Sequence, residues 1–378
     1  DVLDSVVSLS SPATPSRTVF LTGANGFLGR FVCLAWLEKL VTIGGTLICV
    51  IRATDNASAR ARLDAVFTGL DPKLASRYKL ACDHLEVVAG DVGEARMGLG
   101  EADYQRLSMQ VDRVVHVAAK VNHRFSYADL FGANVLGTAE TIRFALLARK
   151  KSIDFISSIA VYSLLDTSQV RNEDSPLCDN ITLSGDYAAG YGASKWAGEQ
   201  LLQQAHRQYG LEVNVFRGDM MLPHQLYKGQ ANTADMFIRL IYSIIHTGLA
   251  PYSFFALNDD GTKVRGHYDG LPVDVVATCV VGVDNSQTQY RAYNIENYHR
   301  NDGISLDTFV DWIEEAGHPV SRITDYQEWF KAFKQAHGQL LEDQQKHSVL
   351  EIIDAFAIPQ FTDAGAMGCD HFQHLVDG

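Results

Sequence analysis

The chain has 378 residues, enough for one large α/β domain with or without a smaller companion. Its composition, 47% hydrophobic and 20% charged, is typical of a globular protein, and no run of about 18 apolar residues predicts a membrane span. The net charge of −13 argues against general nucleic-acid binding, which needs a basic surface, but it leaves room for an anionic cofactor held by local positive charge.

The first residues and the cysteines indicate the context in which the chain works. It begins without Met, no signal peptide is recognisable, and Ser8 to Ser16 is rich in Ser, Pro and Thr. We therefore expect an excised domain or a processed chain, with a linker over residues 1–16. The six cysteines show no Cys-x-x-Cys or Cys/His ligand spacing, which favours free thiols in a reducing, cytoplasmic compartment and no metal site.

Strands and helices alternate through the first half of the chain. The predicted strands are Thr18–Thr22, Thr46–Ile51, Leu85–Ala89, Arg113–Ala118, Ile153–Ser157 and Val213–Phe216. The predicted helices are Phe27–Leu40, Ala57–Phe67, Val135–Arg149 and Tyr191–Gln208. The strands are continuous apolar runs, as expected when both faces of a sheet are covered. This pattern predicts a doubly wound parallel sheet, a Rossmann-like α/β domain, over residues 17–225.

The alternation weakens after Gly218. A late strand is predicted at Tyr290–Ile295, and helices are predicted at Asp235–Thr247, Leu306–Ala316, Tyr326–His337 and Ser348–Phe356. We therefore expect residues 226–378 to form a smaller, mainly helical substrate region, interleaved with the late strands of the sheet.

A glycine-rich segment, Thr22 to Gly29, follows the first strand and opens the first helix. Gly23 permits a tight turn, Gly26 lets the backbone approach a pyrophosphate, and Gly29 lets helix and strand pack closely. The helix N-terminus supplies free N–H groups and a partial positive charge. The segment therefore predicts a dinucleotide site, and the alternative is a glycine-rich turn without a ligand.

The end of the second strand decides between the two dinucleotides. NAD sites usually place Asp or Glu there, whereas this chain has Arg52, with Arg62 farther on. A guanidinium binds a 2′-phosphate, so NADP(H) is predicted, the alternative being arginines that only face solvent. Asp91 is either an acceptor for the adenine amino group or a turn residue. The residues predicted to contact NADP(H) are Thr22, Gly23, Asn25, Gly26, Phe27, Leu28, Gly29, Arg52, Arg62, Asp91, Val92, Ala118, Ala119, Tyr191 and Lys195.

The segment Tyr191-Gly-Ala-Ser-Lys195 places a tyrosine and a lysine one turn apart on one helix face. An ammonium beside a phenol lowers the phenol's pKa from about 10, which suits Tyr191 to protonate an oxyanion formed at a carbonyl. Ser158, at the end of the fifth strand, is predicted to hydrogen-bond the reacting oxygen, and Lys195 to hold the nicotinamide ribose. Ser157 is expected to be a packed strand-end hydroxyl. Asn134 is either a water-mediated partner of Lys195 or a helix N-cap.

The order of these motifs resembles the extended short-chain dehydrogenase/reductase family, a resemblance that runs to about residue 220. Further segments extend through nearly the whole chain: Val19–Arg30, Leu85–Asp91, Val121–His123, Tyr191–Glu199, Phe216–Met220, His267–Asp274 and His347–Leu350. Together they resemble one branch, the C-terminal thioester reductase domain of carboxylic acid reductases, which is related to the terminal reductase domains of nonribosomal peptide synthetases.

The resemblance implies an NADPH-dependent thioester reductase with Ser158, Tyr191 and Lys195 as its catalytic residues. Its substrate would be an acyl thioester on the phosphopantetheine arm of a carrier domain, released as an aldehyde. An adenylation domain and that carrier domain would precede it in the same multidomain protein. The hydroxyl matching Ser158 is often Thr in this family, and Ser keeps the donor.

Three residues are predicted for the substrate side or for gating. Asn122 is assigned to substrate contact. Lys120 lies where the family usually has an apolar residue, so it either alters acyl preference, helps to hold the phosphate of the arm, or faces solvent. Asp269 either hinders cofactor closure until the acyl arm is docked, so that reduction stops at the aldehyde, or caps a turn.

Three other functions are alternatives to the thioester reductase. A sugar-nucleotide epimerase or dehydratase retains NAD, which Arg52 disfavours. An acyl-CoA reductase would act on free thioesters without a carrier domain. A non-catalytic NADP(H)-sensing protein would lose the Tyr/Lys pair, whereas this chain keeps Tyr191 and Lys195.

Overall fold

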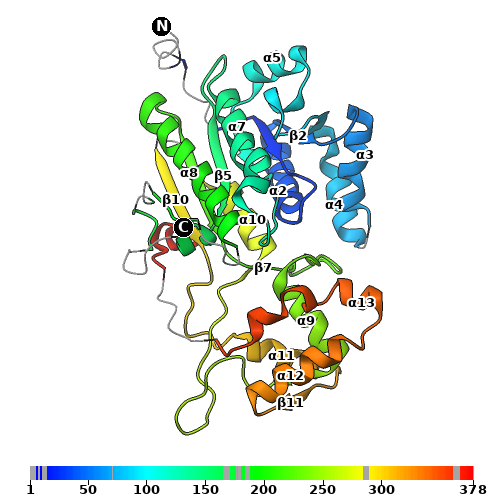
Figure 1. Ribbon diagram of the computed structural model, residues 1–378. Coiled ribbons are helices and arrows are strands. Elements are labelled where there is room, and N and C mark those ends of the chain that lie inside the picture. Colours follow the sequence, from blue (N-terminus) through cyan, green and yellow to red (C-terminus); the bar gives the residue numbers. More distant parts are fainter. Residues whose placement is uncertain are drawn as a thin grey trace. The chain divides into compact units, whose positions relative to one another are not determined.

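The computed structural model describes residues 6, 9–10, 15–69, 71–164, 171–175, 177, 180–183, 188–283, 289–360 and 367–377 (Figure 1). Of the predicted linker, residues 1–5, 7–8 and 11–14 lie outside the described residues. The chain forms two units. The first takes Asp1–Gln230, Leu271–Glu296 and Met367–Gly378, and the second takes Ala231–Gly270 and Asn297–Ala366.

The first unit is built on a seven-stranded sheet in the order β10-β6-β5-β4-β1-β2-β3, with every strand pair parallel. Its strands are β1 (Thr18–Thr22), β2 (Thr46–Ile51), β3 (Leu85–Ala89), β4 (Arg113–His116), β5 (Ser152–Ser158), β6 (Val213–Gly218) and β10 (Tyr290–Ile295). The predicted doubly wound parallel sheet is confirmed. Because all strands run the same way, the ends of β1, β4, β5 and β6 meet at one edge, where ligands bind in such sheets.

Helices cover both faces of this sheet (Figure 1). They are α2 (Phe27–Ile43), α3 (Asn56–Phe67), α4 (Pro72–Ala81), α5 (Glu101–Gln110), α6 (Tyr127–Leu130), α7 (Gly137–Ala145), α8 (Ala189–Tyr209), α10 (Val273–Gly282) and α14 (Asp370–Asp377). Helices α2 and α8 are capped at their C-termini by Gly44 and Gly210, which both have the left-handed backbone conformation. Their N–H groups donate to the carbonyl oxygens of Leu40 and His206, which closes the last helical turns.

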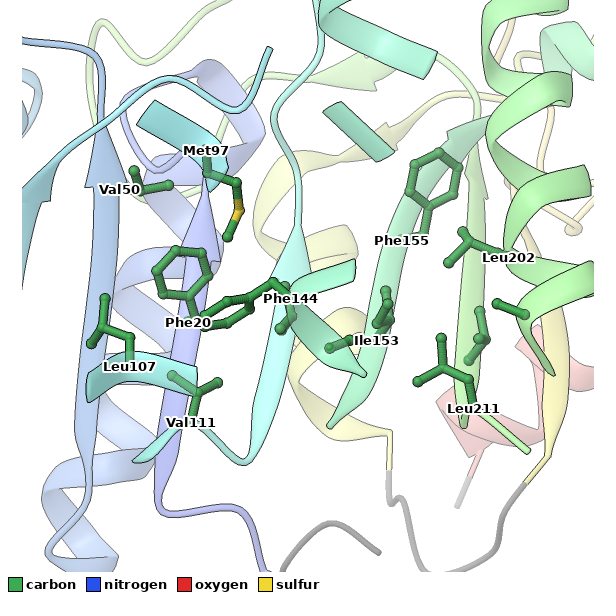
Figure 2. Packing of buried hydrophobic residues seen from close by; sticks show 14 of the residues in the cluster. Phe20, Val50, Met97, Leu107, Val111, Phe144, Ile153, Phe155, Leu202 and Leu211 are labelled. Carbon is green, nitrogen blue, oxygen red and sulfur yellow. The ribbon is translucent and has the colours of Figure 1, made fainter. Parts of the chain in front are cut away.

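Buried apolar side chains on one face join the strands to α5, α7 and α8 (Figure 2). The Phe20 ring of β1 lies 5.1 Å from the Phe144 ring of α7, and Ile153 and Phe155 of β5 belong to the same cluster as Leu202 of α8. This packing sets α8 against β5.

Several predicted bounds were wrong, and the differences have local causes. The fourth strand ends at His116, two residues before the predicted Ala118. The predicted helix Val135–Arg149 is shorter, because a π-helical turn over Phe131–Leu136 precedes α7 and the helix stops at Ala145. No helix is predicted from the sequence for the segments that form α4, α5 and α10.

The second unit is mainly helical. It contains α9 (Met236–Thr247), β8 (Leu249–Pro251), α11 (Leu306–Glu315), β11 (Ser321–Ile323), α12 (Tyr326–His337), α13 (Glu342–Lys346) and a 3₁₀ segment at Leu350–Phe356, where a helix from Ser348 was predicted. Its aromatic core includes Trp329, packed on Phe254 at 5.5 Å and on Phe333 at 4.9 Å between ring centres. Across the described residues, no helix is long and apolar enough to cross a membrane.

Candidate active site

The glycine-rich loop forms a close junction between β1, α2 and the segment after β4. Gly23 has φ of +74°, and a Cβ there would lie 2.6 Å from the Ala118 nitrogen. A Cβ on Gly29 would lie 1.9 Å from the Gly23 carbonyl oxygen. Both positions therefore require glycine, and the loop and helix approach more closely than any side chain would permit.

The first turn of α2 is open to an anion. Its N-cap is Gly26, which has no side chain to cap the free N–H groups, and no acidic residue lies in the first turn. Thr22 braces the floor of the loop, since its Oγ1 accepts a hydrogen bond from the Ala118 N–H at 3.1 Å and lies 2.8 Å from His116 Nδ1. Uncapped N–H groups beside a glycine-walled loop fit a dinucleotide pyrophosphate.

Arg52 and Asp91, predicted for the adenosine end, lie together at the ends of β2 and β3. The Arg52 guanidinium is 3.7 Å from the Asp91 carboxylate, and its side chain is 78% exposed. Arg62 reaches back from α3 to donate to the Arg52 carbonyl oxygen. An exposed guanidinium here is accessible to a phosphate. Val92 lies against the start of α7 at Gly137.

Two glycines on either side of Tyr191 bring the start of α8 against the neighbouring loops. A Cβ on Gly190 would lie 2.2 Å from the Phe125 carbonyl oxygen, and one on Gly192 would lie 2.5 Å from the Ala160 carbonyl oxygen. The second contact is with the turn that follows Ser158. Tyr191 therefore lies between the loop after β4 and the turn after β5.

Burial is the largest cause of the pKa shifts of Tyr191 and Lys195. Tyr191 is 7% exposed, and burial raises the pKa of its phenol above the usual value. Burial lowers the pKa of Lys195 to about 7, an effect that the charge of Glu199 opposes. From the sequence, the Lys195 ammonium is predicted to lower the pKa of the Tyr191 phenol. The shift is in the other direction because burial raises the pKa of the Tyr191 phenol. The Lys195 Nζ is 6.0 Å from the Tyr191 ring centre and donates to the Ile156 carbonyl oxygen at 2.7 Å.

Ser158 ends β5 with its hydroxyl oxygen accepting from the Ala160 N–H at 3.2 Å. That bond leaves the hydroxyl hydrogen free to be donated to a substrate oxygen. The neighbouring Ser157 points into the protein and donates to the Glu199 carboxylate at 2.5 Å. It is a packed strand-end hydroxyl, but one with a charged partner.

The loop after β4 holds the start of α8. Asn134 is not an N-cap. It lies in the π-helical turn, exchanges hydrogen bonds with the Lys120 backbone at 2.8 and 3.1 Å, and donates to Ser194 Oγ at 2.9 Å. The Asn122 side chain accepts from the Arg124 N–H at 2.9 Å. The His123 ring meets the Tyr191 ring edge-on, with centres 5.2 Å apart.

The last two predicted residues, Lys120 and Asp269, contact residues of their own units. The Lys120 side chain is exposed, lies over the Phe125 ring at 4.6 Å and reaches the Asp129 carbonyl oxygen at 3.5 Å. Asp269 belongs to the second unit, where its carboxylate pairs with Arg300 at 2.8 Å and with His267 at 3.3 Å.

Sequence reasoning missed the buried charged residues around Lys195. Glu199 lies one helical turn beyond it, and Arg217 is the next-to-last residue of the apolar strand β6. His116, at the end of β4, is fully buried, and desolvation together with the charge of Lys195 lowers its pKa to about 3. An ionisable residue inside an apolar strand, such as His116 or Arg217, was the signal available in the sequence.

Comparison with known proteins gives consistent results. Residues 21–280 match the model of an NAD-binding family described as male sterility protein. The chain is 47% identical over 358 residues to a carboxylic acid reductase of Segniliparus rugosus, covering 93% of this chain and 30% of that protein. It is 43% identical over 384 residues to a carboxylic acid reductase of Mycobacterium marinum, covering 99% of this chain and 33% of that protein.

Among solved structures, the reductase domain of a nonribosomal peptide synthetase from Mycobacterium tuberculosis superposes with a TM-score of 0.91. The two chains are 39% identical, and the alignment covers 100% of this chain and 88% of that one. The chain thus matches a reductase domain over nearly its whole length, while it spans about a third of the curated relatives named above.

Proposed function

Because the chain belongs to the male sterility protein family, an oxidoreductase family of nicotinamide-binding reductase domains, we propose that it is an NADPH-dependent thioester reductase. Its substrate is an acyl group on the phosphopantetheine arm of a carrier domain, and its product is the aldehyde. The observation that carries the proposal is the placement of Tyr191 and Lys195. Both are buried on α8. Lys195 donates to the Ile156 carbonyl oxygen, two residues before Ser158, and Gly192, next to Tyr191, packs against Ala160, two residues after it. These contacts lie at the sheet edge that also holds the glycine-rich loop.

The choice of NADPH rests on Arg52, whose exposed guanidinium at the end of β2 suits a 2′-phosphate. The glycine-rich loop and the uncapped start of α2 would hold the pyrophosphate, and Lys195 the ribose. When bound, the nicotinamide supplies the two-electron reducing equivalent for the thioester carbonyl.

Residues of this chain stabilise the negative charge that develops on the substrate oxygen. Ser158 donates a hydrogen bond to that oxygen, and Tyr191, kept protonated by burial, supplies a proton. The resulting thiohemiacetal then splits its carbon–sulfur bond, which releases the aldehyde and the pantetheine thiol. The charge of Glu199 favours the protonated form of Lys195 against the effect of burial.

The partners follow from the same proposal. A carrier domain would present the arm and an adenylation domain would load it, both within one multidomain protein of the cytoplasm. We assign Lys120, which is exposed in the loop after β4, and Asn122 to contacts with the arm.

Asp269 is proposed to limit reduction to the aldehyde. Its carboxylate lies 2.8 Å from Arg300 and 3.3 Å from His267, so replacing it with Gly removes the negative charge beside both. If Asp269 gates, the Asp269→Gly protein should reduce free aldehydes faster than the wild type. An unchanged rate would remove the gating role.

The test of the main proposal is turnover by the purified chain. NADPH oxidation should accompany release of one thiol and one aldehyde from an acyl thioester on a carrier domain, and more slowly from an acyl pantetheine. Equal or better turnover of acyl-CoA would favour the reductase of free thioesters instead. Absence of turnover with all three thioesters by folded protein would refute the proposal.

A further inference from the structure

Helix α8 is hydrogen-bonded to two consecutive residues of β5 immediately before Ser158. Lys195 Nζ donates to the Ile156 carbonyl oxygen at 2.7 Å, and Glu199 accepts from the Ser157 hydroxyl at 2.5 Å. Lys195 and Glu199 lie four residues apart on one face of the helix. The strand end that carries Ser158 is therefore held from one side by both.

Glu199 is itself held in place by Arg217 of the adjacent strand. Arg217 Nε lies 3.1 Å from both carboxylate oxygens, and Nη2 lies 2.8 Å from Oε2. The two side chains are 2% and 1% exposed. Ser157 and Arg217 are register partners across β5 and β6, so their side chains share the sheet face that α8 covers.

The groups that face the Lys195 ammonium come from three elements. Helix α8 contributes Tyr191 and Glu199, β4 contributes His116, and β5 contributes the Phe155 ring at 4.9 Å. Burial drives His116 and Tyr191 toward their neutral forms. Glu199 supplies the negative charge that opposes deprotonation of Lys195, and the same carboxylate is anchored by Arg217.

We propose that Glu199 is a positioning residue for the reductase reaction. Through Ser157 it holds the strand end that carries Ser158, and through its charge it faces the Lys195 ammonium. The Glu199–Arg217 pair costs desolvation, because taking two ions out of water is expensive. The pair lies next to Ser157, which precedes Ser158, and the Glu199 charge acts on Lys195. This inference rests on the proposed function.

Three variants separate positioning from general stability. Glu199→Gln keeps an acceptor for Ser157 but removes the charge. Ser157→Ala removes only the hydroxyl contact. The control is Asp154→Asn, because Asp154 forms an equally buried bidentate pair with Arg113, at 2.6 and 3.0 Å, on the same strand but away from Lys195.

Glu199→Gln should lower kcat for the thioester by about tenfold, the value of one charge-assisted hydrogen bond, without changing NADPH binding. It should also move the alkaline limb of the pH profile of kcat/KM to lower pH, because Lys195 then loses its proton more readily. Ser157→Ala should lower kcat without moving that limb. Asp154→Asn should lower the melting temperature while its kcat and pH profile stay those of the wild type.

A double variant, Glu199→Gln with Arg217→Met, tests whether an unpaired Arg217 alone explains the effect. In the double variant, the alkaline limb of the kcat/KM profile should still lie at lower pH than in the wild type. A double variant with the wild-type pH profile of kcat/KM would overturn the inference. So would a Glu199→Gln protein whose pH profile matches that of Asp154→Asn. A Ser157→Ala protein with wild-type kcat would also overturn it. Failure of the proposed function would look different, because wild-type protein would then turn over no thioester at all.

Discussion

Lys195 donates its 2.7 Å hydrogen bond to the carbonyl oxygen of Ile156, two residues before Ser158, and its Nζ lies 6.0 Å from the ring centre of Tyr191. The ammonium is therefore anchored to strand β5. Burial keeps the Tyr191 phenol protonated and brings the pKa of Lys195 to about 7. The phenol therefore carries its proton at neutral pH, although its raised pKa makes it a weaker acid than free tyrosine, and the charge of the lysine depends on its surroundings.

Replacing Tyr191 with Phe tests the acid. The change removes the hydroxyl and keeps the ring that packs against His123. We expect kcat for the thioester to fall by on the order of 10²-fold or more, the usual loss for a positioned general acid, with unchanged NADPH affinity. Tyr209→Phe, at the far end of α8, is the control, and near wild-type kcat in Tyr191→Phe would contradict the assignment.

Arg52 should determine the choice between NADPH and NADH. Arg52→Ala removes a guanidinium that is 78% exposed, so the fold should tolerate it. KM for NADPH should rise by about tenfold or more while KM for NADH changes little, because only NADPH carries the 2′-phosphate. Arg60→Ala is the matched control, since Arg60 pairs with Asp64 at 2.8 Å on α3. An equal change in both KM values would count against the phosphate contact.

Gly29 should not accept even one methyl group. In Gly29→Ala the new Cβ would lie 1.9 Å from the Gly23 carbonyl oxygen, so the loop must move away from α2. We expect loss of NADPH binding by fluorescence titration, together with a lower melting temperature. Gly282→Ala, whose Cβ would meet no described atom within 4 Å, should bind NADPH normally. Normal binding in Gly29→Ala would show that the loop does not hold the cofactor.

Stability should rise with pH above neutrality because of buried lysines. Lys151 is fully buried, donates to the Leu147 and Arg149 carbonyl oxygens at 2.8 Å each, and has its pKa lowered to about 7 by burial. Between about pH 7 and the usual lysine pKa of about 10.4, the unfolded chain binds a proton that the folded chain has lost. The free energy of unfolding should therefore increase with pH in this window, by roughly 2 kcal/mol per such lysine up to pH 9.

Urea unfolding at pH 7 and pH 9 measures this difference. Lys151→Met should remove its share of the pH dependence, whereas Lys79→Met, at an exposed site, should not. A free energy of unfolding that falls from pH 7 to pH 9 in the wild type would contradict the direction expected from burial.

Much of the fold was readable because its strands are covered on both faces. Strands β1, β2, β3 and β10 begin and end at the predicted residues, since continuous apolar runs bounded by turns leave little ambiguity. Helix α10 was missed because Val273–Gly282 is rich in valine, which favours strands. Its packing against α2, including a 2.7 Å bond from Lys39 to the Val281 carbonyl oxygen, overrides that preference.

The sequence by itself determined the features that depend on spacing along the chain. These are the glycine loop between strand and helix, Arg52 at a strand end, and Tyr191 one turn from Lys195. Only the tertiary structure decided what Lys195 and Ser157 contact. The register of β5 against β6 sets Ser157 beside Arg217, and α8 then brings Glu199 to both. Contacts between residues 18 and 42 positions apart depend on how whole elements pack, which no local pattern encodes.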